Sequence, residues 1–343
     1  MVKCTEESKI YVHVQAGVVT GGIELLHQLV HELRNLGRKA FVVYHGRAAH
    51  VVPDDYRVYD LEFTDIVEDS PSNIEVYTET MLHYLGTNHR STQKFWWWLS
   101  VDFFYGAKQF VLLGLWDCLN GRLVRGMRIL LSSIRWSKHP RPDLPAYLSS
   151  LYGLSHITCG YQCAFIRDFI VNNGFADIVP LGDYINDDHV GTFSIDNRKD
   201  IVLYNPKKGL GFVEKLMQLA PDISWCALAG MSREQLRDVM RSAKLYVDFG
   251  NHPGMDRLPR ECAANGCCVI TGKRGSAGYD EDVPLPPGYK FDERQCSLNA
   301  IIARIRETLS CYETEIPRFA PYREFVSGQK RVFVDQLTTI FGK

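Results

Sequence analysis

The stretch from Lys244 to Asp282 restricts the possible folds of this chain more than any other part of the sequence. Two apolar runs, LYVDF and CCVIT, have the composition of buried strands, and each is followed by a glycine. Between them, Asp256 can cap a helix that runs to about Asn265 and ends at Gly266. A strand, a helix and a second strand in this order predict a parallel sheet covered by helices.

The predicted helix begins with cations. Arg257 and Arg260 fall in its first turn, where positive side chains oppose the helix dipole. A bound anion would offset this repulsion, because helix N-termini and arginine side chains both bind phosphate oxygens. The sequence therefore predicts that a diphosphate binds at the start of this helix.

The same alternation of strand and helix extends over much of the chain. Before the central stretch come the strands IVLYNP and ISWCALAG and the helices GLGFVEKLMQLAP and MSREQLRDVMRSA, the second with Ser232 as its N-cap. Near the N-terminus, IYVHV, AGVVTGG, IELLHQLVHELRNLG and KAFVVYH form a strand, a glycine loop, a helix and a strand. The predicted fold class is α/β, with two Rossmann-like domains facing a central cleft. No G-x-G-x-x-G fingerprint is present, which argues against a dinucleotide cofactor.

A polar stretch without periodicity divides the two domains. We expect a first domain over residues 1–186, a linker over 187–200 and a second domain over 201–315. The remaining residues, 316–343, are predicted to form a C-terminal helix that packs back across the first domain.

Composition excludes several classes of protein. The net charge of −1 over 343 residues gives no basic field for a nucleic acid. The chain opens without an apolar signal region, and its ten cysteines fall mostly in apolar patterns, so we expect free thiols and a cytoplasmic protein. No apolar run reaches the roughly 20 residues that span a bilayer.

Segment 110–145 mixes leucines and tryptophans with arginines. Arg122, Arg125 and Arg128 share one edge of a predicted helix, and apolar residues lie on another. This pattern occurs in helices at the inner face of a membrane, and it occurs more often in an ordinary surface helix or helical hairpin packed on the first domain. Both interpretations stay open.

Polar residues that follow predicted strands in the first domain are candidates for catalysis. His13, Glu79 and Asp102 stand at such strand ends, beyond which ligands bind in open α/β sheets. Each could act as a general base toward a bound ligand. We expect no metal, because the histidines and cysteines lack the spacing of metal ligands.

Three motifs together resemble the GT-B glycosyltransferases, in particular the group 1, glycogen-synthase-like enzymes. YNPKKG, which includes Tyr204, Asn205, Lys207 and Lys208, is similar to the strand-end segment whose lysine neutralises the donor diphosphate. PRECAANGCCVITG is similar to the segment whose glutamate, here Glu261, binds the donor ribose. The loop with Gly21 and Gly22 matches the glycine loop that approaches the donor phosphates from the first domain.

The chain departs from the pattern of this family at one point. Many retaining members have an acidic residue eight positions before the ribose glutamate, and Pro253 stands there in GNHPG. In this segment, which also contains Gly254, the residues Asn251, His252 and Asp256 could make the missing sugar contact. The resemblance places the diphosphate beside Lys208, with Arg257 or Arg260 supplying the second cation.

The resemblance implies a metal-independent glycosyltransferase. It would move a sugar from a nucleotide-diphosphate donor, of unknown base, to a glycan or lipid-linked acceptor, in surface polysaccharide biosynthesis and without a further cofactor. Two alternatives remain open at this point. One is a sugar-nucleotide epimerase or hydrolase of the same fold, and the other is a non-catalytic two-domain protein that binds an anionic ligand.

Overall fold

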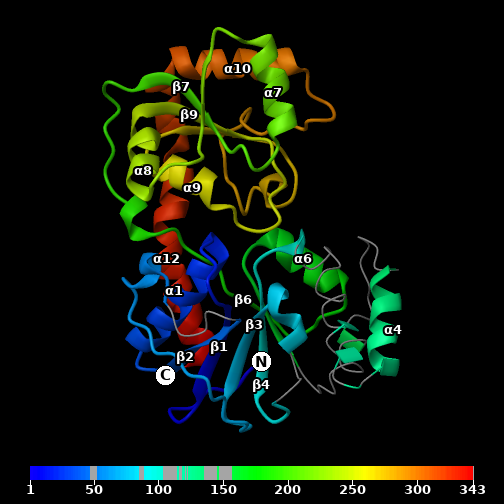
Figure 1. Ribbon diagram of the computed structural model, residues 1–343. Helices are drawn as coiled ribbons and strands as arrows, with labels where there is room; N and C mark the ends of the chain where they lie inside the picture. Colours follow the sequence, from blue (N-terminus) through cyan, green and yellow to red (C-terminus); the bar gives the residue numbers. More distant parts are fainter. Residues whose placement is uncertain are drawn as a thin grey trace. The chain divides into compact units, whose positions relative to one another are not determined.

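The computed structural model describes residues 1–46, 52–84, 89–102, 114–115, 118–119, 121, 123–134, 145–146 and 157–342. The chain forms two compact units, each built around one parallel sheet (Figure 1). Unit 1 comprises Met1–Gln162, Ile166–Gly182 and Val332–Lys343, and unit 2 comprises Cys163–Phe165 and Asp183–Arg331.

Unit 1 contains a six-stranded sheet in the order β2-β1-β3-β4-β5-β6, and every neighbouring pair is parallel. The strands are β1 (Lys9–Gln15), β2 (Lys39–His45), β3 (Ile74–Thr78), β4 (Gln93–Trp98), β5 (Thr158–Tyr161) and β6 (Ile178–Pro180). The helical elements with fully described bounds are α1 (Gly21–Asn35), η1 (Asp54–Tyr56), η2 (Glu79–Tyr84), α4 (Leu123–Ile134), most of α6 (Ala164–Asn172) and the end of α12 (Ala320–Phe341).

The core of unit 1 is centred on β4. Its three consecutive tryptophans, Trp96, Trp97 and Trp98, are completely buried, so both faces of this strand lie in the interior. The Trp97 indole donates its N–H to the Leu181 carbonyl at 2.8 Å, and its ring stacks on Phe333 from the last part of α12. A fully buried strand between two helical layers is the arrangement that the apolar run KFWWW predicts.

Unit 2 contains a four-stranded parallel sheet in the order β10-β9-β7-β8. The strands are β7 (Lys199–Tyr204), β8 (Ser224–Ala227), β9 (Ala243–Asp248) and β10 (Cys268–Thr271). The helical elements are η3 (Asp187–His189), α7 (Leu210–Leu219), α8 (Arg233–Ser242), α9 (Arg257–Ala264), η4 (Ser276–Gly278), α10 (Leu298–Ser310), α11 (Tyr312–Glu315), η5 (Ile316–Phe319) and the start of α12.

The strand order of unit 2 reverses between β7 and β9. These two strands are neighbours, yet the chain leaves β7 toward β8 at one edge and leaves β9 toward β10 at the other. The loops that follow β7 and β9 therefore diverge from a common point. In open α/β sheets this switch point is where ligands bind.

Most predicted elements are present, and one predicted strand is shorter than expected. The capping box at Ser232 is confirmed, with Gln235 as its partner. The strand predicted over Ile74–Met81 ends at Thr78, and the 3-10 turn η2 follows. The ten cysteines are free, as predicted. Among the described residues, each helix is too short or too polar to cross a bilayer.

Candidate functional site

Two loops meet at the switch point of unit 2, and glycines allow their close contact. Gly209, in the loop after β7, has φ = 68°, and a Cβ there would lie 2.5 Å from the Phe249 carbonyl carbon. A Cβ on Gly250, in the loop after β9, would lie 2.6 Å from Cβ of Lys208. Since real Cβ atoms do not approach other atoms this closely, both positions require glycine. The contact fixes Lys208 beside the loop that leads to α9.

The Lys208 ammonium forms an ion pair with the Asp256 carboxylate. Its Nζ is 2.7 Å from Oδ1 and 2.8 Å from Oδ2 of Asp256, and 36% of the lysine side chain is exposed. The neighbouring Lys207 is exposed, and its backbone N–H donates to the Asn205 side chain at 2.9 Å. Of the two predicted diphosphate lysines, Lys208 is therefore the one directed at the start of α9. Tyr204, the last residue of β7, is half-buried.

Asp256 occupies the N-cap position of α9, as predicted, but it does not cap the helix. Its side chain accepts no hydrogen bond from the N–H groups of α9, because both carboxylate oxygens bind Lys208. The predicted helix boundary is confirmed and the predicted capping bond is wrong. The N-terminus of α9 consequently has no side-chain cap at its N-cap residue.

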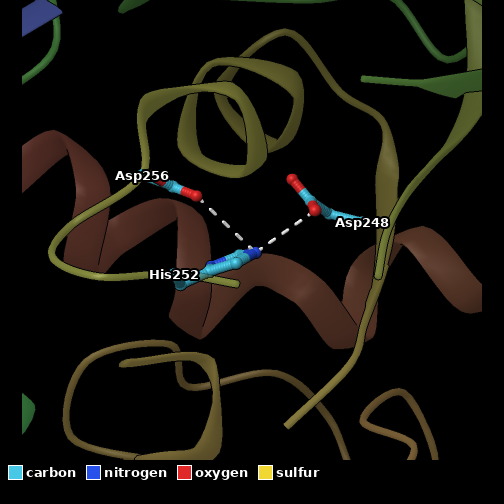
Figure 2. Close-up of side chains that lie close together, drawn as sticks. All are labelled: Asp248, His252 and Asp256. Carbon is cyan, nitrogen blue, oxygen red and sulfur yellow. Dashed lines mark ion pairs between the residues drawn. The ribbon is translucent and has the colours of Figure 1, made fainter. Parts of the chain in front are cut away.

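His252 lies between two carboxylates, as Figure 2 shows. Its Nε2 is 3.4 Å from Oδ1 of Asp248 and 3.8 Å from Oδ2 of Asp256, and it has no hydrogen-bond partner although the residue is 1% exposed. Asp248 accepts hydrogen bonds from the Tyr246 hydroxyl at 2.7 Å and from the Gly250 N–H at 2.8 Å. Burial favours neutral His252, but the adjacent Asp248 outweighs burial and raises the pKa of His252.

The carboxylate and imidazole atoms of Asp248, His252 and Asp256 lie within 4.8 Å of one another, a set of ligand types that a metal could use. The Lys208 ammonium already neutralises Asp256 through both of its oxygens. A divalent ion there would have to share Asp256 with this ammonium. The cluster therefore has a protein cation of its own, and we do not assign it to a metal.

The segment GNHPG is pinned by its backbone. His252 pairs with Gly275 in an isolated β-bridge, and its carbonyl accepts the N–H of Ser276 at 2.9 Å. The Ser276 hydroxyl donates to the carbonyl of Gly254 at 2.6 Å, and both residues are buried. The side chain of His252 therefore faces the carboxylates from the interior, whereas its predicted alternative, Asn251, is half-buried.

Arg260 does not carry the role that we predicted for it. It is 1% exposed, and its five N–H donors all have protein acceptors: both oxygens of Asp183 at 2.7 Å, the Gln329 side chain at 2.8 Å, and the carbonyls of Met255 and Asp256. A diphosphate could reach this guanidinium only by breaking that network. We therefore assign Arg260 to the interior of unit 2.

Two further predicted residues on α9 stay candidates. Arg257 is the first residue of the helix and is half-buried. The Glu261 carboxylate is 14% exposed, and His189 Nε2 lies 3.9 Å from it. Burial lowers the pKa of His189, so that this imidazole is held toward its neutral form beside the glutamate.

In unit 1, His13 is buried in a network around a charged residue that the sequence analysis missed. The Glu75 carboxylate is inaccessible to solvent and accepts hydrogen bonds from His13 Nε2 at 3.0 Å and from Lys94 Nζ at 2.8 Å. His13 also stacks on Tyr77, and its Nδ1 lies 2.7 Å from His45 Nε2. Burial lowers the pKa of His13. At 2% exposure, His13 could exchange a proton with a ligand only through a neighbour such as His45.

The other candidates in unit 1 follow strands of its sheet. Glu79 comes directly after β3, is 2% exposed and accepts the N–H of Leu99 at 3.0 Å; burial raises the pKa of Glu79 to about 7. Asp102 is exposed, four residues after β4. Gly21 and Gly22 form the first turn of α1, whose N-cap is Thr20.

The functional residues that the sequence analysis missed had one recognisable signal in the sequence. Each is a charged residue inside an apolar strand pattern. Asp248 lies within the run LYVDF, Glu75 within IEVYT and Lys94 within KFWWW. Buried charges are paired in folded proteins, so each of them predicts a partner nearby. The sequence alone does not say which partner.

Comparison with known proteins supports the fold. No protein-family model matches the chain, and no curated protein matches it by sequence. Several solved structures, however, are similar to this chain in fold. Sucrose-phosphate synthase from Thermosynechococcus elongatus is similar at a TM-score of 0.63 and 11% identity, covering 98% of both chains. HepE from Anabaena, solved with UDP and glucose, is similar at 0.57 and 11% identity, covering 97% of this chain and 99% of HepE.

TarM, known from S. aureus, is also similar, at a TM-score of 0.53 and 11% identity. The match covers 81% of this chain, which spans 56% of the length of TarM. These proteins are glycosyltransferases of the GT-B class. Two parallel-sheet units in one chain and this similarity lead to the same conclusion: the chain has the GT-B glycosyltransferase fold.

Proposed function

We propose that this protein transfers a sugar from a UDP-sugar to a glycan or lipid-linked acceptor, in the biosynthesis of a surface polysaccharide. The observation that carries the proposal is the position of Lys208 at the switch point of unit 2, beside the N-terminus of α9. HepE, which shares the fold, was solved with UDP and with UDP-glucose, and this supports uridine as the base.

The chemistry requires positive charge at the leaving group. Breaking the bond between the sugar and the nucleotide leaves negative charge on the β-phosphate, which preorganised cations and N–H groups stabilise. In our proposal Lys208 and Arg257 supply this charge together with the N-terminus of α9, and no metal takes part. Glu261 accepts hydrogen bonds from the ribose hydroxyls.

On the acceptor side we propose Asp102 as the first candidate, because it is exposed and follows a strand of the sheet. Glu79, whose pKa burial raises to about 7, is suited to exchange a proton near neutral pH, and at 2% exposure it would do so through a neighbouring group. Both would act on an acceptor held by unit 1. The cleft between the domains stays a prediction.

We also propose that the protein binds the inner face of a membrane through segment 110–145. Most of this segment lies outside the described residues. Its described helix, α4, exposes four apolar side chains: Leu123, Val124, Met127 and Leu131. We expect the protein to sediment with vesicles of anionic lipids, and the triple change of Arg122, Arg125 and Arg128 to Glu to abolish this. Sedimentation that the triple change leaves unaltered would show that the segment does not bind the membrane.

The donor is tested by calorimetry with UDP, GDP and CDP and then by product analysis with UDP-glucose. We expect UDP to bind most tightly and the sugar to be transferred only when an acceptor glycan is present. Turnover of the UDP-sugar without an acceptor would instead identify an epimerase or hydrolase. Binding to none of the nucleotides would refute the proposed donor class.

A further inference from the structure

The lysine proposed to bind the donor diphosphate already binds an anion of the protein. Both oxygens of Asp256 lie within 2.8 Å of Lys208 Nζ, in the bidentate manner that phosphate oxygens would adopt. Asp256 also stands at the N-cap position of α9 without using it. Its carboxylate therefore occupies the lysine that a diphosphate needs.

The local charge is unfavourable for a diphosphate as long as this pair is closed. Lys208 contributes one positive charge and Asp248 and Asp256 contribute two negative charges, so a neutral His252 leaves a net charge of −1 and a protonated His252 leaves a net charge of zero. In either case an incoming diphosphate meets no net positive charge in this cluster. The lysine becomes available only when the Asp256 carboxylate moves to another hydrogen-bond donor.

His252 offers such a donor. Its Nε2 is buried, has no hydrogen-bond partner and lies 3.8 Å from Oδ2 of Asp256 (Figure 2). A buried nitrogen that has only long ion-pair contacts and no hydrogen bond of ordinary geometry is unfavourable, and a shift of the Asp256 carboxylate by about 1 Å would complete such a hydrogen bond. Asp248, 3.4 Å away on the other side, keeps the imidazole in place.

We propose that Asp256 competes with the donor diphosphate for Lys208, and that His252 receives the Asp256 carboxylate when the phosphate displaces it. Asp256 and His252 are then positioning residues, and neither touches the sugar. The proposal rests on the proposed function, since it requires that Lys208 binds the diphosphate. It predicts that removing the Asp256 carboxylate strengthens nucleotide binding.

The test is calorimetry on the full-length chain with three ligands: UDP, inorganic pyrophosphate, and uridine, which lacks phosphate. We expect Asp256→Asn to tighten the binding of UDP and pyrophosphate by about tenfold or more, the range of one hydrogen bond to a charged group, and to leave uridine unchanged. The matched control is Asp280→Asn. It removes the carboxylate of a second Lys–Asp pair, in which Lys290 Nζ lies 2.8 Å away, and should change none of the three affinities.

The role of His252 is tested by variants made in the wild-type protein and in the Asp256→Asn variant. His252→Asn, which lacks an atom at the Nε2 position, should weaken UDP binding by about fivefold, whereas His252→Gln, whose amide reaches toward that position, should weaken it less. In the Asp256→Asn background, His252→Asn should have no effect on UDP, because the carboxylate that it receives is gone. Thermal melting of each variant verifies that it is folded.

Each of the following results would overturn the proposal. If Asp256→Asn binds UDP more weakly than the wild type does, then the Asp256 carboxylate helps to bind the donor instead of competing with it. If Asp256→Asn and His252→Asn change the affinity for UDP independently of each other, then the two residues are not coupled. UDP binding that requires added Mn²⁺ and is lost with EDTA would turn the cluster into a metal site. If the wild-type protein binds neither UDP nor pyrophosphate, the proposed function fails as well, whereas tight UDP binding that is insensitive to these variants refutes the exchange alone.

Discussion

Replacing Arg260 by alanine should destabilise unit 2 severely. The guanidinium is 1% exposed and pairs with both oxygens of Asp183, whose side chain is 2% exposed. Arg260→Ala would leave the Asp183 carboxylate buried without its counter-ion and would open a cavity beside α9. Breaking a buried ion pair from one side costs about 3–5 kcal/mol of the free energy of unfolding.

That loss should lower the melting temperature of the transition that unfolds unit 2 by roughly 6–20 °C, for a unit of this size. The measurement is thermal and urea unfolding followed by circular dichroism. The matched control is Arg306→Ala, because Arg306 also approaches both oxygens of an aspartate, Asp222, with 52% of its side chain exposed. The two variants remove the same chemical group and differ mainly in burial, so Arg306→Ala should change the melting temperature little.

Equal destabilisation by the two variants would refute the assignment of Arg260 to the interior. A second test isolates the unpaired charge. Asp183→Asn in the Arg260→Ala background removes the buried negative charge and should recover part of the lost stability. If Arg260→Lys stays folded but no longer binds UDP, then the arginine does contact the diphosphate and the original prediction was right.

Three further predictions follow from the same structure. Lys208→Ala should weaken UDP binding by about tenfold or more, whereas Lys207→Ala, at the exposed neighbour, should change it little in calorimetry; equal effects would contradict the assignment. Glu261→Gln should weaken the binding of UDP but not of pyrophosphate, because the proposed partner is the ribose, and a loss with both ligands would exclude this role. Burial raises the pKa of Glu79 from 4.5 to about 7, so this residue stabilises the folded state below pH 4.5 and loses that contribution as the pH rises toward 7. Urea unfolding should therefore show that the wild type loses stability relative to Glu79→Gln across this range, and parallel profiles would contradict the shift.

Hydrophobic periodicity predicted the secondary structure well, because it depends on neighbours in the sequence. The strand KAFVVYH and the helix that begins at Gly21 are set by the spacing of their own apolar residues and by local signals such as the Thr20 cap. The strand predicted to run to Met81 ended early at Thr78, because the residues from Glu79 on form a 3-10 turn.

Charge pairing could not be predicted in the same way. Arg260 and Asp183 are 77 positions apart, and Lys208 and Asp256 are 48 positions apart. From the sequence, Arg257 and Arg260 were equivalent cations in one helical turn. Their different burial depends on which face of α9 meets the rest of unit 2, and this is a property of the packed unit.

The sequence by itself determined the α/β class, the two Rossmann-like halves and the segment that carries the candidate site, since each depends on local periodicity and on glycines that few other residues can replace. Only the tertiary structure decided which charges meet. In the folded unit Arg260 and Asp183 form a buried ion pair, Lys208 pairs with Asp256, and His252 lies between two carboxylates. The physical reason is that an ion pair depends on distance and burial, and both arise only when segments far apart in the sequence, such as the loops after β7 and β9, come together in the folded unit.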